Sequence, residues 1–130
     1  NFADSSENHF RFASSLESYV AKVEVQYLQQ VILNLLLNAD KFTKQGTITL
    51  EVSVNESFIE FAVADTGCGI PQEKQQVVFE RFIKLNDFAQ GTGLGLSICK
   101  LIIQKWGGEI WVDPAYSKGA RFVFTHPIVK

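Results

Sequence analysis

The chain has 130 residues, of which 46% are hydrophobic and 20% charged, and its formal net charge is −2. This length suits a single domain with a sizeable buried core, and the composition is ordinary for a globular protein. A net charge so close to zero gives no basic field that would attract nucleic acid or an anionic membrane, and no apolar run approaches the roughly 20 residues needed to span a bilayer.

The start of the chain and its cysteines indicate where such a domain would work. The first residue is Asn rather than Met and no signal peptide follows, so we expect a domain excised from a longer protein. Cys68 and Cys99 have neither metal-like spacing nor a disulfide framework, and they suit a reducing, cytosolic setting. The polar residues 1–8 predict a flexible lead-in, with one domain over residues 9–130.

Two short strands and a long helix are predicted first. Phe10–Phe12 and Tyr19–Val23 alternate apolar and polar residues, as strands do. Gln26–Phe42 is the clearest helix, and Gly46 is predicted to provide a left-handed exit from it. The predicted buried stripe of this helix recurs at steps of three and four residues and consists of Leu28, Val31, Ile32, Leu35, Leu36, Ala39 and Phe42.

A polar strip lies on a different face of the same helix. Asn34, Asn38 and Lys41 fall together on this face, within about 60° of one another at 100° per residue. Two asparagines inside a helix are mildly unfavourable, and two interpretations are open: a solvated face, or an inward strip that holds a metal or phosphate. In the second case the neutral carbonyl oxygen of Asn38 suits Mg²⁺, and Lys41 adds positive charge one turn away. Asp40 points elsewhere and is not expected to be a ligand.

A β-hairpin follows, and its second strand ends on a carboxylate. Thr47–Val54 and Phe58–Ala64 alternate at period two on either side of a turn. Asp65 comes directly after the second strand, with Gly67 and Gly69 just beyond it. A short acceptor at a strand end suits hydrogen bonding to the edge of a flat polar ligand, and the glycines let the backbone pass close to that ligand. A plain turn that ends the strand is the alternative.

The last third of the chain predicts two more helices and a final hairpin. Pro71 is placed to start a helix over Gln72–Val78. Leu94–Trp106 form the next predicted helix, and the strands Glu109–Val112 and Arg121–Thr125 pair after it. The residues that lie at helical spacing in the longer helix are Leu94, Ile98, Leu101, Ile102 and Lys105.

A glycine cluster, residues 91–95, opens the longer helix and forms a sensible anion site. Exposed backbone N–H groups and the helix dipole both favour phosphate at such a position. The cluster lacks the preceding strand of the dinucleotide fingerprint, the Gly-Lys-Ser/Thr end of the Walker loop and the surrounding hairpin of a protein-kinase glycine loop. A purely structural hinge stays open as an alternative.

Taken together, these pieces resemble the ATP-binding catalytic domain of sensor histidine kinases, in the superfamily shared with DNA gyrase, Hsp90 and MutL. The resemblance covers about residues 8–127. Four motifs occur in the family order, and each is weak alone. They are an asparagine helix, a first glycine box, a phenylalanine box and a second glycine box, at Gln29–Thr43, Asp65–Ile70, Phe79–Phe82 and Gly91–Leu96.

The resemblance implies a Bergerat-type α/β fold, a two-layer sandwich in which helices back a mixed, mostly antiparallel sheet. ATP would lie between the helices, outside the sheet. Asp65 would accept a hydrogen bond from the adenine amino group, and Gly67 and Gly69 would let the backbone reach the base. Ile70 and Phe42 would pack beside that base.

The resemblance also implies how the phosphates and the metal are held. Asn38 would bind Mg²⁺ with Asn34 beside it, and Lys41 and Lys84 would contact phosphates. Residues 79–92 would form a mobile lid. The remaining nucleotide contacts implied by the two later boxes are Phe82, Gly91, Thr92, Gly93, Leu94 and Gly95.

One position bears on the reaction. The ATPase branch of the superfamily has a glutamate four residues before the metal asparagine, as general base for water, whereas this chain has Asn34, which cannot take a proton at neutral pH. The resemblance therefore implies a protein histidine kinase that donates the ATP γ-phosphoryl group to a histidine. An ATPase of the same superfamily, a nucleotide-binding interaction module and an anti-sigma-type serine kinase are the alternatives.

The partners follow from the same resemblance. The histidine box of the family's dimerisation domain is absent from this sequence, so the acceptor would lie on a separate domain of the parent protein, with a response regulator downstream. We expect no nucleic-acid partner, a monomeric isolated domain and a cytoplasmic location, whether or not the parent is anchored in a membrane.

Overall fold

The computed structural model describes residues 7–14, 25–80 and 95–128. Strands, helices and one 3₁₀ turn follow one another along the chain. In order they are β1 (His9–Ser14), α2 (Val25–Phe42), β2 (Thr47–Val54), β3 (Phe58–Asp65), η1 (Gln72–Lys74), α3 (Gly95–Lys105), β4 (Ile110–Val112) and β5 (Arg121–Pro127).

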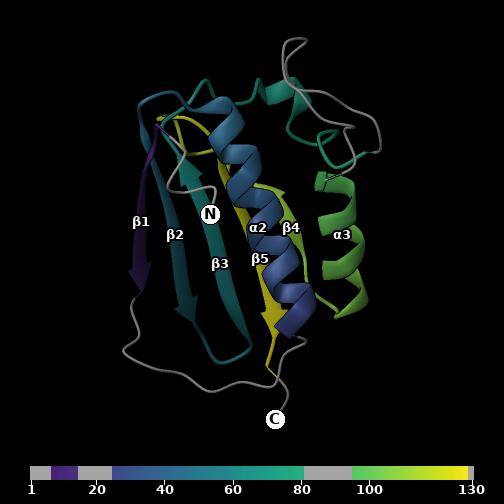
Figure 1. The fold of residues 1–130 in the computed structure, drawn as a ribbon. Coiled ribbons are helices and arrows are strands. Elements are labelled where there is room, and N and C mark those ends of the chain that lie inside the picture. Colours follow the sequence, from purple (N-terminus) through teal and green to yellow (C-terminus); the bar gives the residue numbers. More distant parts are fainter. Residues whose placement is uncertain (1–6, 15–24, 81–94, 129–130) are drawn as a thin grey trace.

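Five strands form one sheet in the order β1-β2-β3-β5-β4. Strands β1 and β2 run parallel, and the other neighbouring pairs run antiparallel. Both helices, α2 and α3, cover the same face of this sheet (Figure 1). The predicted α/β two-layer sandwich with a mixed, mostly antiparallel sheet is therefore confirmed. In the part of the chain that the structure describes, no helix combines the length and apolar character needed to cross a membrane.

The core lies between the sheet and the helices. The ring of Phe61 on β3 stacks on that of Phe124 on β5, with 4.8 Å between centroids. Side chains alternate along a strand, so Phe61, Val63 and Asp65 share the side of β3 that faces the helices. The sheet register thus directs the carboxylate of Asp65 toward the helical layer.

The two helices differ in how far the spacing of their apolar residues marks the buried face. Helix α2 buries Val31, Leu35 and Ala39, all in the predicted stripe. In α3, whose helical spacing was predicted, Ile102 packs on the core whereas Leu101 is 64% exposed. Apolar residues occur all round this helix, so their spacing alone does not select a face. The buried residues of α3 are Leu96, Ser97, Cys99 and Ile103.

Two local predictions are corrected. The left-handed residue after α2 is Gln45, with φ 50°, rather than Gly46. Gly46 is needed for close approach instead, since a Cβ there would lie 2.4 Å from Thr66 Oγ1. The helix expected over Gln72–Val78 is only the 3₁₀ turn η1 followed by further turns, because its first five residues are polar and offer no apolar face to pack.

Asn8, placed in the predicted lead-in, is bonded into the fold. Its Nδ2 donates to Asp40 Oδ1 and to Thr43 O, both at 2.8 Å, and its Oδ1 accepts from Gly46 N at 3.0 Å. The side chain thereby ties the start of β1 to the segment after α2. Residues 1–6 and the predicted strand at 19–23 lie outside the described residues, and the boundary at residue 8 stays a prediction.

Candidate functional site

Asp65 ends β3 and is only 2% exposed. Its Oδ1 accepts two backbone hydrogen bonds, from Gly67 N at 2.9 Å and from Ala120 N at 3.1 Å. Its own N–H donates to Ala120 O at 2.8 Å, and its carbonyl accepts from the Tyr116 hydroxyl at 2.9 Å. Among the described residues both bonds to the carboxylate fall on Oδ1, which leaves Oδ2 as the acceptor for a ligand.

The surroundings also set the protonation of Asp65. Burial raises its pKa above the ordinary value, and the hydrogen bonds from the N–H groups of Gly67 and Ala120 offset this only in part. A buried carboxylate that keeps one oxygen unshared is costly to the fold. A turn that merely ends a strand does not need such a group, so the geometry favours a ligand-binding interpretation of Asp65.

The C-terminal end of α2 lies against the glycine segment that follows Asp65. Cys68 N donates to Phe42 O at 3.2 Å. A Cβ on Gly67 would lie 2.2 Å from Phe42 O and 2.7 Å from Thr43 Oγ1, so only glycine permits this approach. Thr43 Oγ1 is buried and has no hydrogen-bond partner among the described residues. The structure therefore brings Phe42, Gly67 and Asp65 together.

The loop between β4 and β5 closes the other side of Asp65. A Cβ on Gly119 would lie 2.2 Å from Asp65 O and 2.6 Å from its Oδ1. Gly69 faces the same loop and has a φ of +74°, a left-handed conformation that favours glycine. Ile70, next in the first glycine box, is half-buried and packs on the core. The first glycine box is thus shaped by this loop as much as by α2.

Sequence reasoning missed Tyr116, Gly119 and Ala120, because the segment between the last two strands was treated only as a connection. The available signal was Gly119, two positions before a strand, and turn glycines are common. Tyr116 and Ala120 lie 51 and 55 positions from Asp65. Contacts over such separations depend on strand order and register.

The polar strip on α2 is not a uniformly solvated face. Asn34 and Asn38 are half-buried, and Lys41 is exposed in the last turn. The thiol of Cys99 on α3 donates to Val31 O at 3.8 Å, and burial raises the pKa of that thiol to about 11, against a lowering by the side chain of Asn34. Asn34 therefore lies beside α3, while Lys41 is exposed and its predicted contact with phosphate stays a prediction.

Several predicted nucleotide contacts lie outside the described residues: Phe82, Lys84, Gly91, Thr92, Gly93 and Leu94. Gly95 begins α3, and a Cβ on it would meet no described atom within 4 Å. Close packing against the described residues therefore does not require glycine at this position. The roles predicted for these residues and for a lid over 79–92 stay predictions.

The described residues contain no group of three or more His, Cys, Asp or Glu side chains that could hold a metal ion. Mg²⁺ in nucleotide sites typically takes one or two protein oxygens and completes its shell with phosphate oxygens and water. The side-chain oxygen of Asn38 offers one such ligand. The donor set therefore fits Mg²⁺ that arrives with a nucleotide better than it fits a metal cage.

Comparison with known sequences places this geometry in a family. The family model for histidine kinase-, DNA gyrase B-, and HSP90-like ATPases matches residues 24–130. The adaptive-response sensory kinase SasA of Gloeothece citriformis is 41% identical in an alignment of length 109 that covers 81% of this chain and 28% of that protein. Sensor histidine kinase WalK of Bacillus subtilis is 34% identical in an alignment of length 135, gaps included, that covers 97% of this chain and 22% of that protein. The chain thus spans about a quarter of the length of these relatives.

Solved structures agree with this result. The nucleotide-free catalytic domain of histidine kinase ThkA has a TM-score of 0.86 and 30% identity, covering 98% of this chain and 83% of that one. Full-length ShkA in complex with AMPPNP has a TM-score of 0.85 and 31% identity, and the match covers 95% of this chain and 26% of that one. ThkA in complex with the response regulator TrrA has a TM-score of 0.82 and 26% identity, covering 98% and 36%. The chain belongs to the histidine kinase-, DNA gyrase B-, and HSP90-like ATPase family, as an ATP-binding catalytic domain of the sensor histidine kinase type.

Proposed function

We propose that this chain binds ATP with Mg²⁺ and presents the γ-phosphoryl group to a histidine on a separate dimerisation domain of its parent protein. The observation that carries the proposal is the buried Asp65 carboxylate. Its Oδ1 is occupied by two backbone N–H groups, so Oδ2 can accept from the amino group of adenine. A few well-placed polar groups in an otherwise apolar site are typical of small-molecule recognition.

The base would lie beside the first glycine box. Gly67 and Gly69 let the backbone approach it, while Ile70 and Phe42 supply apolar surface. Without a Cβ, Gly67 packs closely on Phe42 O, which keeps Phe42 beside the first glycine box. Asp65 then sets the orientation of the base by accepting its amino hydrogen.

The phosphates would extend toward the polar strip of α2. Asn38 provides an oxygen ligand for Mg²⁺, and Lys41, exposed in the last turn of α2, attracts phosphate charge together with Lys84. Phe82 and the second glycine box complete the contacts, with backbone N–H groups at the start of α3 directed to phosphate. Lys41 and Asn38 act mainly by positioning and by offsetting negative charge, which is the main contribution of a protein to phosphoryl transfer.

Asn34 favours transfer over hydrolysis. Its amide cannot act as a general base for water, and it lies beside the thiol of Cys99 on α3. When bound, ATP supplies the γ-phosphoryl group: the bond to the β–γ bridging oxygen breaks, a bond to a histidine ring nitrogen forms, and ADP leaves. ATP use also implies a cytoplasmic location for this domain.

The partners belong to the parent protein and its pathway. The matched region is only 28% of SasA and 22% of WalK, and these relatives therefore have room for a histidine-bearing dimerisation domain. ThkA, whose fold is similar, was solved in complex with a response regulator. A response regulator is therefore proposed as the final acceptor, and the isolated domain is proposed to be monomeric.

Binding is tested by calorimetric titration of the 130-residue chain with AMPPNP, with and without Mg²⁺. We expect binding that strengthens when Mg²⁺ is present, because Asn38 and the phosphates share the ion. Absence of binding under both conditions would contradict the proposal and leave only a fold that resembles a kinase domain.

Transfer is tested with γ-labelled ATP and the histidine-bearing domain of the parent protein. We expect label on that domain that is lost in acid and kept in base, as an N–P bond requires. Acid-stable label would indicate a serine kinase, and rapid phosphate release without the acceptor domain would indicate an ATPase. Binding with neither reaction would indicate an interaction module.

A further inference from the structure

Tyr116 reaches from the loop between β4 and β5 to the end of β3. Its hydroxyl donates to the main-chain carbonyl of Asp65 at 2.9 Å. We infer that Tyr116 is a positioning residue that holds the Asp65 carboxylate in the direction needed to select adenine over a purine with a 6-oxo group. This inference rests on the proposed role of Asp65 in binding adenine.

The bonds around Asp65 come from both sides and leave it little freedom. Ala120 O accepts from the N–H of Asp65 at 2.8 Å, and Ala120 N donates to Asp65 Oδ1 at 3.1 Å. Gly67 N donates to the same oxygen at 2.9 Å. The Tyr116 hydroxyl occupies the one remaining polar group of the main chain, the carbonyl. Side chain and main chain of Asp65 are therefore oriented together.

The loop that carries Tyr116 lies directly against Asp65. A Cβ on Gly119 would lie 2.2 Å from Asp65 O and 2.7 Å from Gly67 N. There is no space for the loop to move closer, so the loop packs directly against the carboxylate. Outward movement of the loop is what the Tyr116 bond opposes.

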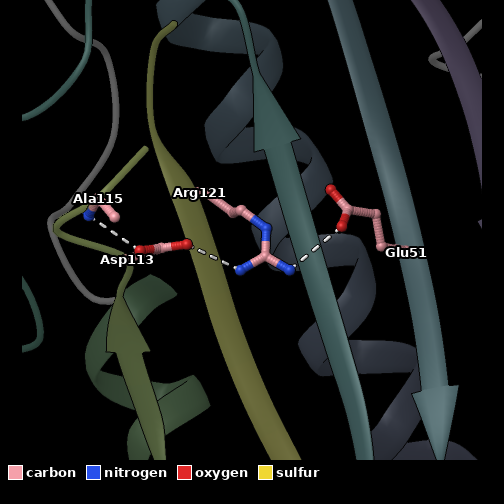
Figure 2. Close-up of polar contacts among 4 residues, drawn as sticks. All are labelled: Glu51, Asp113, Ala115 and Arg121. Atoms are coloured by element: carbon pink, nitrogen blue, oxygen red, sulfur yellow. Dashed lines mark hydrogen bonds and ion pairs between the residues drawn. The ribbon is translucent and has the colours of Figure 1, made fainter. Parts of the chain in front are cut away.

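The base of this loop is fixed on the opposite face of the sheet. Figure 2 shows the guanidinium of Arg121 between two carboxylates, with Nη1 at 3.0 Å from Asp113 Oδ2 and Nη2 at 3.1 Å from Glu51 Oε1. Asp113 N also donates to Arg121 O at 2.8 Å, and Asp113 Oδ1 accepts from Ala115 N at 2.9 Å. Tyr116 is thus presented by a loop closed at its base.

The short side chains of β3 make this closure possible. Arg121 on β5 must cross β3 to reach Glu51 on β2, and on that face β3 carries Ala62 and Ala64. Longer side chains there would block the path of the guanidinium. The ion pairs are partly exposed, with 21–36% of each side chain accessible, so they orient the loop more than they stabilise the fold.

The chemistry of the hydroxyl suits this role. Burial and the nearby charges of Asp65 and Glu51 raise the pKa of Tyr116, against a lowering by Arg121. The phenol therefore stays protonated and donates at physiological pH. Adenine offers an amino hydrogen to the carboxylate, whereas hypoxanthine offers an oxygen that repels it. Discrimination between the two bases consequently depends on how firmly the carboxylate is held.

The test compares Tyr116→Phe with the wild type in titrations with Mg·ATP and Mg·ITP. Tyr116 is half-buried, and phenylalanine keeps the ring while removing only the donor. We expect the ratio of ATP to ITP affinity to fall about three- to tenfold, the effect of one neutral hydrogen bond. Tyr27→Phe, on the exposed part of α2, is the matched control and should leave the ratio unchanged.

A second measurement does not depend on nucleotide. Amide hydrogen exchange at Ala120 and Gly67 should be faster in nucleotide-free Tyr116→Phe than in the wild type, because both N–H groups bond to Asp65. An equal loss of affinity for both nucleotides, or unchanged exchange, would overturn the inference. A wild type that binds neither nucleotide, or binds both equally, would instead overturn the proposed role of Asp65, and the inference with it.

Discussion

The two ends of the candidate nucleotide site are built in different ways. At the Asp65 end, the acceptor is held by the backbone N–H groups of Gly67 and Ala120 and by a hydroxyl on its carbonyl. At the α2 end, Asn38 is half-buried and Lys41 is exposed on one helical turn. The first end is held by the chain itself, whereas the second is proposed to be completed by Mg²⁺ and phosphate.

This difference separates selectivity from electrostatic attraction. A carboxylate fixed by the backbone loses little entropy on binding and distinguishes bases by geometry. An exposed lysine contributes attraction that salt screens. We therefore expect changes at the Asp65 end to alter which nucleotide binds or whether the domain folds, and changes at the α2 end to alter the dependence on Mg²⁺.

Asp65→Asn should have the largest effect on binding. The asparagine oxygen can still accept from Gly67 and Ala120, but its amide nitrogen would face the amino group of adenine with a donor. Loss of a charge-assisted bond costs about 2–3 kcal/mol, or about 100-fold in the dissociation constant for AMPPNP. Thermal unfolding should be unchanged or shifted upward, because the charge of Asp65 is unfavourable in the fold. Wild-type affinity in this variant would remove Asp65 from adenine recognition.

Gly119→Ala should destabilise the Asp65 end without touching α2. The added Cβ would lie 2.2 Å from Asp65 O, so the loop or the end of β3 must shift, at a cost of about 1–3 kcal/mol in the free energy of unfolding. Urea denaturation measures this loss. Gly95→Ala is the matched control, because its Cβ meets no described atom within 4 Å. Equal stability of the two variants would contradict the close packing at Gly119.

Asn38→Ala should act on the metal rather than on the base. We expect at least about tenfold loss of the affinity gained from Mg²⁺, with metal-free binding nearly unchanged, because one oxygen ligand is removed. Titration with AMPPNP at varied Mg²⁺ measures it. Gln30→Ala, exposed on the same helix, serves as control. An unchanged metal titration would contradict the assignment of Asn38 as a ligand of Mg²⁺.

The smallest expected effect is on pH dependence. The folded-state pKa of Asp65 is raised above its ordinary value of 3.8, so the folded state holds this proton more tightly than the unfolded state. The stability contributed by Asp65 is therefore fully present below pH 3.8 and falls as pH rises through the folded pKa. The unfolding free energy of the wild type minus that of Asp65→Asn should therefore decline as pH rises over that window. A difference that rises with pH would contradict the direction.

The helices show how far periodicity alone predicts packing. The stripe of α2 was predicted correctly because its apolar residues recur at steps of three and four, although Leu33 and Leu37 lie outside it and stay exposed. In α3 apolar residues surround the helix, yet Ile103 is buried whereas Leu101 is 64% exposed. The sheet and α2 decide that question, because only contact with them removes a given side from water.

By itself the sequence determined the local features: the long helix, the hairpin that ends on Asp65, the spacing of Gly67 and Gly69, and the exclusion of a general base at Asn34. Each depends on residues that are close to one another in the sequence. Only the tertiary structure decided which groups hold Asp65 in place. Tyr116 and Ala120 lie 51 and 55 positions away, and they meet Asp65 because β5 pairs with β3 in one register, which no local pattern specifies.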